Sequence, residues 1–234
     1  MQLNLSTKQG IKRKLNQDAL SYNNNFINAK NEFHTSELIS NNGENIFIIA
    51  DGMGGYSGGD YASNYLIREI YTQFANNNNF NITKSLNSID DELIEISKND
   101  HTKSGMGTTV VSAIIQSNNV KVFNVGDSSL FHITNKSIEK ISIDDNLPGD
   151  NKSVITQCIG NFKQPLNIHT FNFQWKSGDY ILMLSDGVSD YISEDILLKS
   201  VNSIHPNKAK LLCDEAINLG STDDVSAMVL KYDE

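Results

Sequence analysis

The sequence predicts an α+β fold in which helices pack against a largely antiparallel sheet. Short apolar or alternating runs bounded by turn residues indicate strands in both halves of the chain. Three segments carry apolar residues at spacings of three and four, which is typical of amphipathic helices. No stretch has the composition of an interdomain linker, and 234 residues are enough to bury one sizeable core.

The first half of the chain predicts strands and then helices. Residues 2–12 alternate and indicate a strand, whereas residues 21–45 are polar and irregular, as in a hairpin connection. The apolar run 46–50 predicts a strand that leads into Asp51. Two helices should follow, with apolar faces formed by Ala62, Leu66 and Ile70 and by Leu86, Ile89, Leu93 and Ile96.

From residue 108 the pattern changes to strands. Residues 108–125 and 129–142 predict two hairpins, and residues 166–173 predict a further strand. Residues 180–185 form another apolar strand, which ends at an Asp-Gly pair. A final strand should begin at residue 225, after a third helix whose apolar face is Ala209, Leu212, Ala216 and Leu219.

Composition argues against several classes of function. A formal net charge of −9 disfavours a nucleic-acid-binding surface. No stretch approaches eighteen apolar residues, and the first residues lack the apolar core of a secretion signal. Cys158 and Cys213 show neither metal-ligand nor disulfide spacing and are expected to be buried reduced thiols. We therefore expect a cytoplasmic protein that binds neither nucleic acid nor membrane. We also expect it to be a monomer, although composition does not address this.

Five aspartates lie beside apolar strands. Glycine follows two of them and precedes a third, and five glycines follow Asp51 within eight residues, where they permit close backbone approach. A single aspartate at a strand end is usually a turn residue, but five in one domain are harder to explain in this way. These residues are Asp18, Asp51, Asp127, Asp186 and Asp223.

If these side chains converge, they require a counter-charge. Two carboxylates about 4 Å apart repel by roughly 4 kcal/mol at an effective dielectric constant near 20. All the candidate ligands are oxygen atoms, which favours Mg²⁺ or Mn²⁺ over zinc. Two such ions can activate water and neutralise a phosphoryl oxygen. Arg13 could hold a phosphate through two hydrogen bonds, or it could simply be a surface residue in the cluster Lys12-Arg13-Lys14.

Seven blocks resemble, in order and spacing, the metal-dependent serine/threonine phosphatases (PPM, protein phosphatase type 2C), especially the bacterial branch. The resemblance extends from about Gly10 to Leu230. It implies a four-layer α-β-β-α sandwich of two antiparallel sheets flanked by helices, as one phosphatase domain over residues 1–234. The blocks are GIKRKLNQDA, ADGMGG, GDYAS, SGMGTTVV, NVGDS, LSDGVSD and TDDVS.

The resemblance also implies roles for the site residues. Asp51 would bridge two core ions, and the Gly52 carbonyl would bind one of them. Asp186 and Asp223 would complete the shell of the other ion. Asp18 would orient metal-bound water.

A third, weaker ion would lie beside Asp127 and Asp190, together with Asp186. Arg13 would hold the substrate phosphate, so that Arg13, Asp18 and Asp51 form the catalytic set. Metal-bound water would attack phosphorus directly, without a phosphoenzyme.

Three features depart from the family pattern. Met53 stands where eukaryotic relatives carry a histidine, and Gln17 stands where many relatives carry Glu. The flap region, about residues 143–153, is shortened, so the substrate choice of the family cannot be carried over to this chain.

The histidines match no catalytic position and are expected to be structural or at the surface: His34, His101, His132, His169 and His205.

The predicted function is therefore that of a Mg²⁺- or Mn²⁺-dependent phosphatase acting on the phosphoserine and phosphothreonine products of a cognate serine/threonine kinase. Two alternatives stay open. One is a catalytically weak relative that binds phosphoproteins and regulates a partner. The other is a hydrolase of small phosphoesters, which the short flap keeps under consideration.

Overall fold

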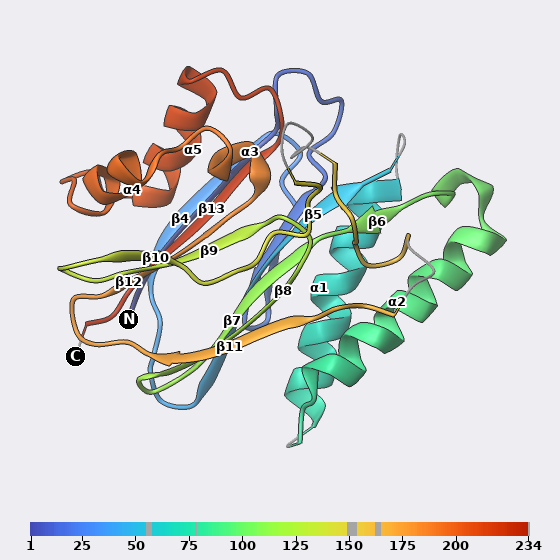
Figure 1. Ribbon diagram of the computed structural model, residues 1–234, viewed down its shortest axis with the longest axis horizontal. Helices are drawn as coiled ribbons and strands as arrows, with labels where there is room; N and C mark the ends of the chain where they lie inside the picture. The colour runs from blue at the N-terminus through green and yellow to red at the C-terminus, as the bar shows by residue number, and fades with distance from the viewer. Residues whose placement is uncertain (55–57, 78, 149–153, 162–164, 234) are drawn as a thin grey trace.

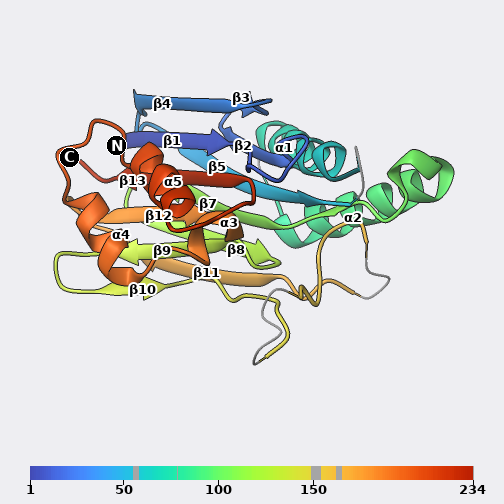
Figure 2. The same cartoon turned by 90° about the horizontal axis from the view of Figure 1, so that it is seen from above.

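The computed structural model describes residues 1–54, 58–77, 79–148, 154–161 and 165–233. Two antiparallel sheets pack face to face, and helices cover the outer face of each sheet (Figures 1 and 2). This arrangement confirms the α-β-β-α sandwich.

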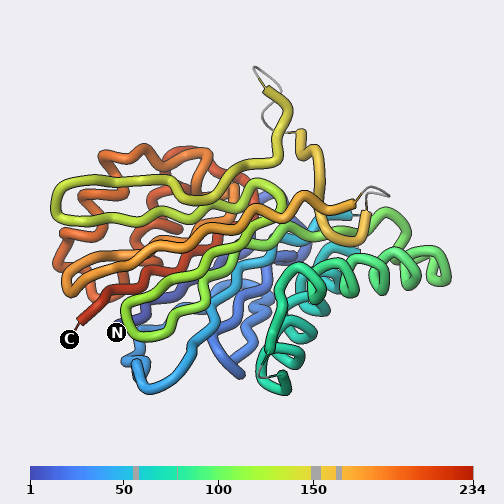
Figure 3. The backbone as a smooth tube through the Cα atoms, turned by 60° about the horizontal axis from the view of Figure 1, so that its bottom comes forward, coloured from blue at the N-terminus to red at the C-terminus, as the bar shows by residue number. Residues whose placement is uncertain are grey.

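Within the described residues, the first sheet has six strands in the order β10-β9-β12-β13-β1-β4. Two neighbouring strands of this sheet join the two ends of the chain, because β1 pairs with β13 and places Leu5 opposite Met228. Both termini therefore lie at the same end of the molecule (Figure 3). The strands are β1 (Gln2–Lys8), β4 (Glu32–Leu38), β9 (Ser129–Ile133), β10 (Ile138–Lys140), β12 (Tyr180–Leu184) and β13 (Val225–Lys231).

Over the same residues, the second sheet has seven strands, with the main order β11-β8-β7-β5-β2-β3 and β6 paired to the end of β5. The strands are β2 (Asp18–Tyr22), β3 (Asn25–Ile27), β5 (Glu44–Met53), β6 (Gly107–Thr108), β7 (Val110–Gln116), β8 (Asn119–Val125) and β11 (His169–Gln174).

Helices cover the outer faces of the two sheets unequally. The long helices α1 (Gly58–Asn76) and α2 (Ile82–Asn99) pack on the second sheet, and a short 3-10 helix, His101–Lys103, follows them. Shorter helices pack on the first sheet: α3 (Asp186–Ser189), α4 (Glu194–Val201) and α5 (Lys208–Asn218).

Strand β5 shows why the run before Asp51 is continuously apolar. Side chains alternate between the two faces of a strand. Ile46 and Ile48 pack against the helices, whereas Phe47 and Ile49 pack between the sheets. A strand covered on both faces needs apolar residues at every position.

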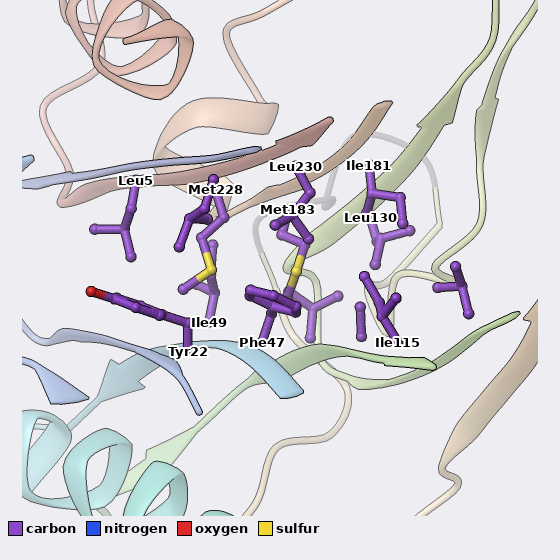
Figure 4. Packing of buried hydrophobic residues seen from close by; sticks show 14 of the residues in the cluster. Leu5, Tyr22, Phe47, Ile49, Ile115, Leu130, Ile181, Met183, Met228 and Leu230 are labelled. Atoms are coloured by element: carbon purple, nitrogen blue, oxygen red, sulfur yellow. The ribbon is translucent and has the colours of Figure 1, made fainter. Parts of the chain in front are cut away.

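The core between the sheets is apolar and fully buried (Figure 4). Met183, Met228 and Leu230 of the first sheet face Phe47 and Ile49 of the second, and none of these side chains is exposed. Burying a side chain of this size contributes roughly 1.5–3 kcal/mol. The stability of this core can therefore offset unfavourable charge repulsion elsewhere in the fold.

Two parts of the chain differ from the sequence-based expectation. The prediction that residues 21–45 are irregular was wrong, because they contain β3 and β4. Strand β4 is almost entirely exposed and lies at a sheet edge, so it has no apolar pattern to detect. Helix α4 is likewise absent from the prediction.

Two expectations from composition can be compared with the structure. Cys158 and Cys213 are free and buried, as expected. Within the described ranges, no helix combines the length and the hydropathy needed to span a bilayer.

Candidate active site

A cleft of about 690 Å³ opens where the ends of β5 and β12 approach the start of β13. Its walls include three apolar side chains, those of Met53, Ile155 and Tyr191. Most of the predicted site residues also line it: Arg13, Asp51, Gly52, Asp186, Asp190 and Asp223.

Asp18 and Asp51 are direct neighbours across two strands. The antiparallel register of β2 and β5 pairs Asp18 with Asp51. Like charges directly opposite each other in a sheet are destabilising. Asp18 is fully buried, and its burial, followed by the charge of Asp224, raises its pKa well above the usual range. Burial and then the charge of Asp18 raise the pKa of Asp51 in the same way.

Asp186 reaches the same point from the other sheet. It is the first residue of α3, directly after β12, and its carboxyl group lies within hydrogen-bonding reach of that of Asp51. Burial raises the pKa of Asp186. The next residue must be glycine, because a Cβ atom at Gly187 would lie 2.0 Å from the Asp224 carbonyl oxygen.

Gly52 allows α1 to approach the end of β5. A Cβ atom at this position would lie 2.1 Å from the carbonyl oxygen of Gly59, near the start of α1. The Gly52 amide donates to the Gln17 carbonyl oxygen at 3.2 Å, and the same oxygen accepts from the Ser63 hydroxyl at 2.7 Å. Gln17 thus ties β5 and α1 together.

Arg13 and Asp223 form a two-point ion pair in the cleft. The Arg13 Nε donates to Asp223 Oδ1 at 2.5 Å, and Nη2 donates to Oδ2. The hydrogen bond to Asp223 raises the pKa of the guanidinium, which stays charged. Arg13 is therefore a cleft residue, and its partner in the structure is a predicted metal ligand.

Asp224 has a role that the sequence analysis did not recognise. Its two carboxylate oxygens accept from the amides of Gly10, at 2.8 Å, and Gln17, at 2.9 Å. It thereby closes the loop that carries Arg13. Burial raises the pKa of Asp224. The sequence held one sign of this role: Asp224 is an acidic residue at the start of a buried strand, and a buried carboxylate requires hydrogen-bond partners.

Asp127 lies behind the cleft, after the end of β8. It is only 6% exposed, and its burial, followed by the charges of Asp186, Asp190 and Asp144, raises its pKa to about 7. These electrostatic contacts place Asp127 near Asp186 and Asp190, and Asp190 itself is exposed on the cleft wall.

The arrangement of the carboxylates differs from a closed ligand cage. In the described part of the chain, no three His, Cys, Asp or Glu side chains form a group that could hold a metal ion by itself. One predicted ligand, Asp223, is paired with Arg13 in the structure.

The same carboxylates nevertheless fit hydrated divalent cations. One oxygen each of Asp18, Asp127 and Asp186 is buried without a hydrogen-bond partner, and leaving such an atom unpaired is costly. Mg²⁺ commonly keeps several waters and uses only one or two protein carboxylates. Cations with their waters would supply partners for these oxygens and relieve the repulsion between Asp18 and Asp51.

Relatives of similar length are named as protein phosphatases. A relative that is 24% identical over 88% of this chain and 92% of its own length is named serine/threonine phosphatase stp, from Listeria monocytogenes serotype 4b. Another, 26% identical over 100% of this chain and 98% of its own length, is named protein phosphatase PhpP, from Streptococcus pneumoniae serotype 2.

Solved structures share the fold. The S. agalactiae serine/threonine phosphatase superimposes with a TM-score of 0.85 at 22% identity, covering 99% of this chain and 100% of its own. The phosphatase Stp1 from Staphylococcus aureus has a TM-score of 0.83 at 22% identity, covering 99% and 95%. The family model for protein phosphatase 2C matches residues 32–216, most of the chain. The chain therefore belongs to the protein phosphatase 2C family of metal-dependent protein phosphatases.

Proposed function

We propose that this phosphatase uses Mg²⁺ or Mn²⁺ to hydrolyse phosphoserine and phosphothreonine in proteins. The observation that carries the proposal is the convergence of Asp18 from β2 and Asp186 from α3 on Asp51 of β5, beside Arg13 in the cleft. The names of the relatives, serine/threonine phosphatases, support the substrate class.

The residues of the cleft would have different roles in the reaction. Bound cations would supply an activated water and neutralise phosphoryl oxygens. Asp51, Asp186 and Asp223, with the Gly52 carbonyl, would hold the two core ions. Asp18, opposite Asp51, would orient water through its unpaired oxygen.

Three further residues complete the proposal. Asp127 and Asp190 would hold a third, weaker ion together with Asp186. Arg13 would exchange Asp223 for the substrate phosphate. No histidine lies among the described residues that line the cleft, so the leaving oxygen would take its proton from water.

Metal removal tests this function. Turnover of a phosphothreonine peptide should require Mn²⁺ or Mg²⁺ and should disappear in EDTA, because the carboxylates alone provide no activated water. Release of phosphate should be measured alongside hydrolysis of p-nitrophenyl phosphate. Turnover of the small ester alone would indicate a small-phosphoester hydrolase. Metal binding without turnover of either substrate would indicate a regulator that binds phosphoproteins.

Arg13→Ala is expected to raise KM for the phosphothreonine peptide by about tenfold or more, with a smaller fall in kcat. The reason is that a charge-assisted hydrogen bond contributes roughly 1.5–3 kcal/mol. Steady-state kinetics would measure both constants. Arg13→Lys is the matched control, because it keeps the charge without the two-point geometry. A fall in kcat at constant KM would instead mean that Arg13 acts mainly in the transition state.

The wider setting is also a proposal. We expect residues 1–234 to act as one phosphatase domain, as a monomer in the cytoplasm, on the substrates of a cognate serine/threonine kinase. The free buried thiols fit a reducing compartment. Residues 149–153 of the predicted short flap lie outside the described residues, so the shortened flap stays a prediction.

A further inference from the structure

Asp145 binds the backbone immediately before Asp127. Its Oδ2 accepts from the Gly126 amide at 2.8 Å, and its own amide donates to the Gly126 carbonyl oxygen at 3.1 Å. Gly126 has a φ of +96°, and a Cβ atom there would lie 2.7 Å from the side chain of Thr109. The chain thus turns sharply into Asp127, and Asp145 holds this turn from both sides.

The other contacts of Asp145 join two further segments. Its Oδ1 pairs with His169 Nε2 at 2.8 Å, at the start of β11. Its Oδ2 also accepts from Gln157 Nε2 at 2.7 Å. The Asp145 and His169 side chains are only 10% and 13% exposed. Both carboxylate oxygens are therefore used, by donors from three separate parts of the chain.

The backbone of Asp145 also fixes one wall of the cleft. Its carbonyl oxygen accepts from the amide of Thr156 at 2.6 Å and from the hydroxyl of Thr156 at 2.9 Å. The preceding residue, Ile155, lines the cleft and forms an isolated bridge with Asn146. Figure 3 shows that the described residues on either side of 149–153 extend away from the sheets. The two hydrogen bonds from Thr156 to Asp145 join the two sides of this extension.

We propose that Asp145, held in place by His169, is a positioning residue that orients Asp127 and Ile155 toward the cleft. The inference rests on the proposed function, because it assigns Asp145 to the support of the third, weaker ion beside Asp127. Side chains that orient a metal ligand typically contribute 10- to 100-fold to metal affinity. A residue with only a structural role would change stability without this selective effect.

Titration of the full chain with Mn²⁺ by isothermal calorimetry tests the inference. Asp145→Asn keeps the size of the side chain but turns an amide nitrogen toward one of its donors. The weakest class of Mn²⁺ sites should lose affinity by about tenfold, while the tighter ions bind as before. The matched control is Asp179→Asn, because Asp179 pairs with His132 at 3.1 Å with similar burial, at the opposite end of β12 from the cleft. This control should leave the whole isotherm unchanged.

Variants of His169 provide a second measurement should Asp145→Asn fail to fold. His169→Leu removes the donor to Asp145 and should weaken the same Mn²⁺ sites, whereas His169→Gln can still donate and should restore part of the affinity. Equal losses of thermal stability in Asp145→Asn and Asp179→Asn, with unchanged isotherms, would overturn the inference.

Asp127→Ala separates the inference from the function on which it rests. If Asp127→Ala alters the weak Mn²⁺ sites but Asp145→Asn and His169→Leu do not, the positioning role is wrong and the third site stands. If Asp127→Ala leaves the isotherm unchanged, the third site is wrong, and the role of Asp145 is rejected with it. Neither outcome bears on metal-dependent turnover at the core ions, which tests the proposed function separately.

Discussion

Asp51→Asn is expected to lower kcat/KM for a phosphothreonine peptide by at least about 10³-fold, which corresponds to roughly 4 kcal/mol of transition-state stabilisation. Asp51 faces Asp18 across the sheet and Asp186 from α3, so it is the point at which both sheets contribute charge. Asparagine keeps the shape of the side chain but loses the charge. Steady-state kinetics at saturating Mn²⁺ would measure the loss.

The loss should occur in a folded protein. Removing one of several crowded carboxylates relieves repulsion, so the thermal midpoint of Asp51→Asn in EDTA should equal or exceed that of the wild type. Asp186→Asn should behave in the same way. Near-normal turnover in either variant would refute the assigned site, and a large fall in the midpoint would mean that activity is lost through unfolding.

The second large effect is on stability as a function of pH. In EDTA, the thermal midpoint should fall as the pH rises from about 4 to 7 and beyond. The folded-state pKa of Asp127 is about 7, above its ordinary value of 3.8, so the folded chain retains a proton that the unfolded chain has lost. The raised pKa values of Asp18, Asp51 and Asp186 act in the same direction.

For Asp127 alone this effect is on the order of 4 kcal/mol across the window. A protein of this size shifts by roughly 2–4 °C per kcal/mol, so the midpoint should move by about 10 °C. Calorimetry at several pH values would show the slope. Saturating Mn²⁺ should remove it, and Asp127→Asn should reduce it. A midpoint independent of pH in EDTA would mean that these carboxylates do not crowd one another.

The parts that could be predicted from sequence are those with a local physical signature. Strand β5 is covered on both faces, which requires an unbroken apolar run, and that run led directly to Asp51. Helices α1 and α2 present apolar stripes to the second sheet. The seven motif blocks indicated the family and, through it, the sandwich of two antiparallel sheets flanked by helices.

The parts that could not be predicted depend on contacts across long distances in the chain. The pairing of Arg13 with Asp223 joins residues 210 positions apart. Strand β4 is held by its backbone ladder with β1, and α4 is a short helix that packs on α5. Short helices and exposed edge strands are stabilised mainly by such tertiary contacts, which leave little trace in local sequence.

The position of β13 between β1 and β12 has a consequence for synthesis. The final strand of the chain separates the two halves of the first sheet, and Asp223 immediately precedes it. Until these residues leave the ribosome, β1 with β4 and β12 with β9 are two unconnected pieces, and the loop of Arg13 lacks Asp224. A nascent chain that still lacks β13 therefore cannot assemble a complete cleft.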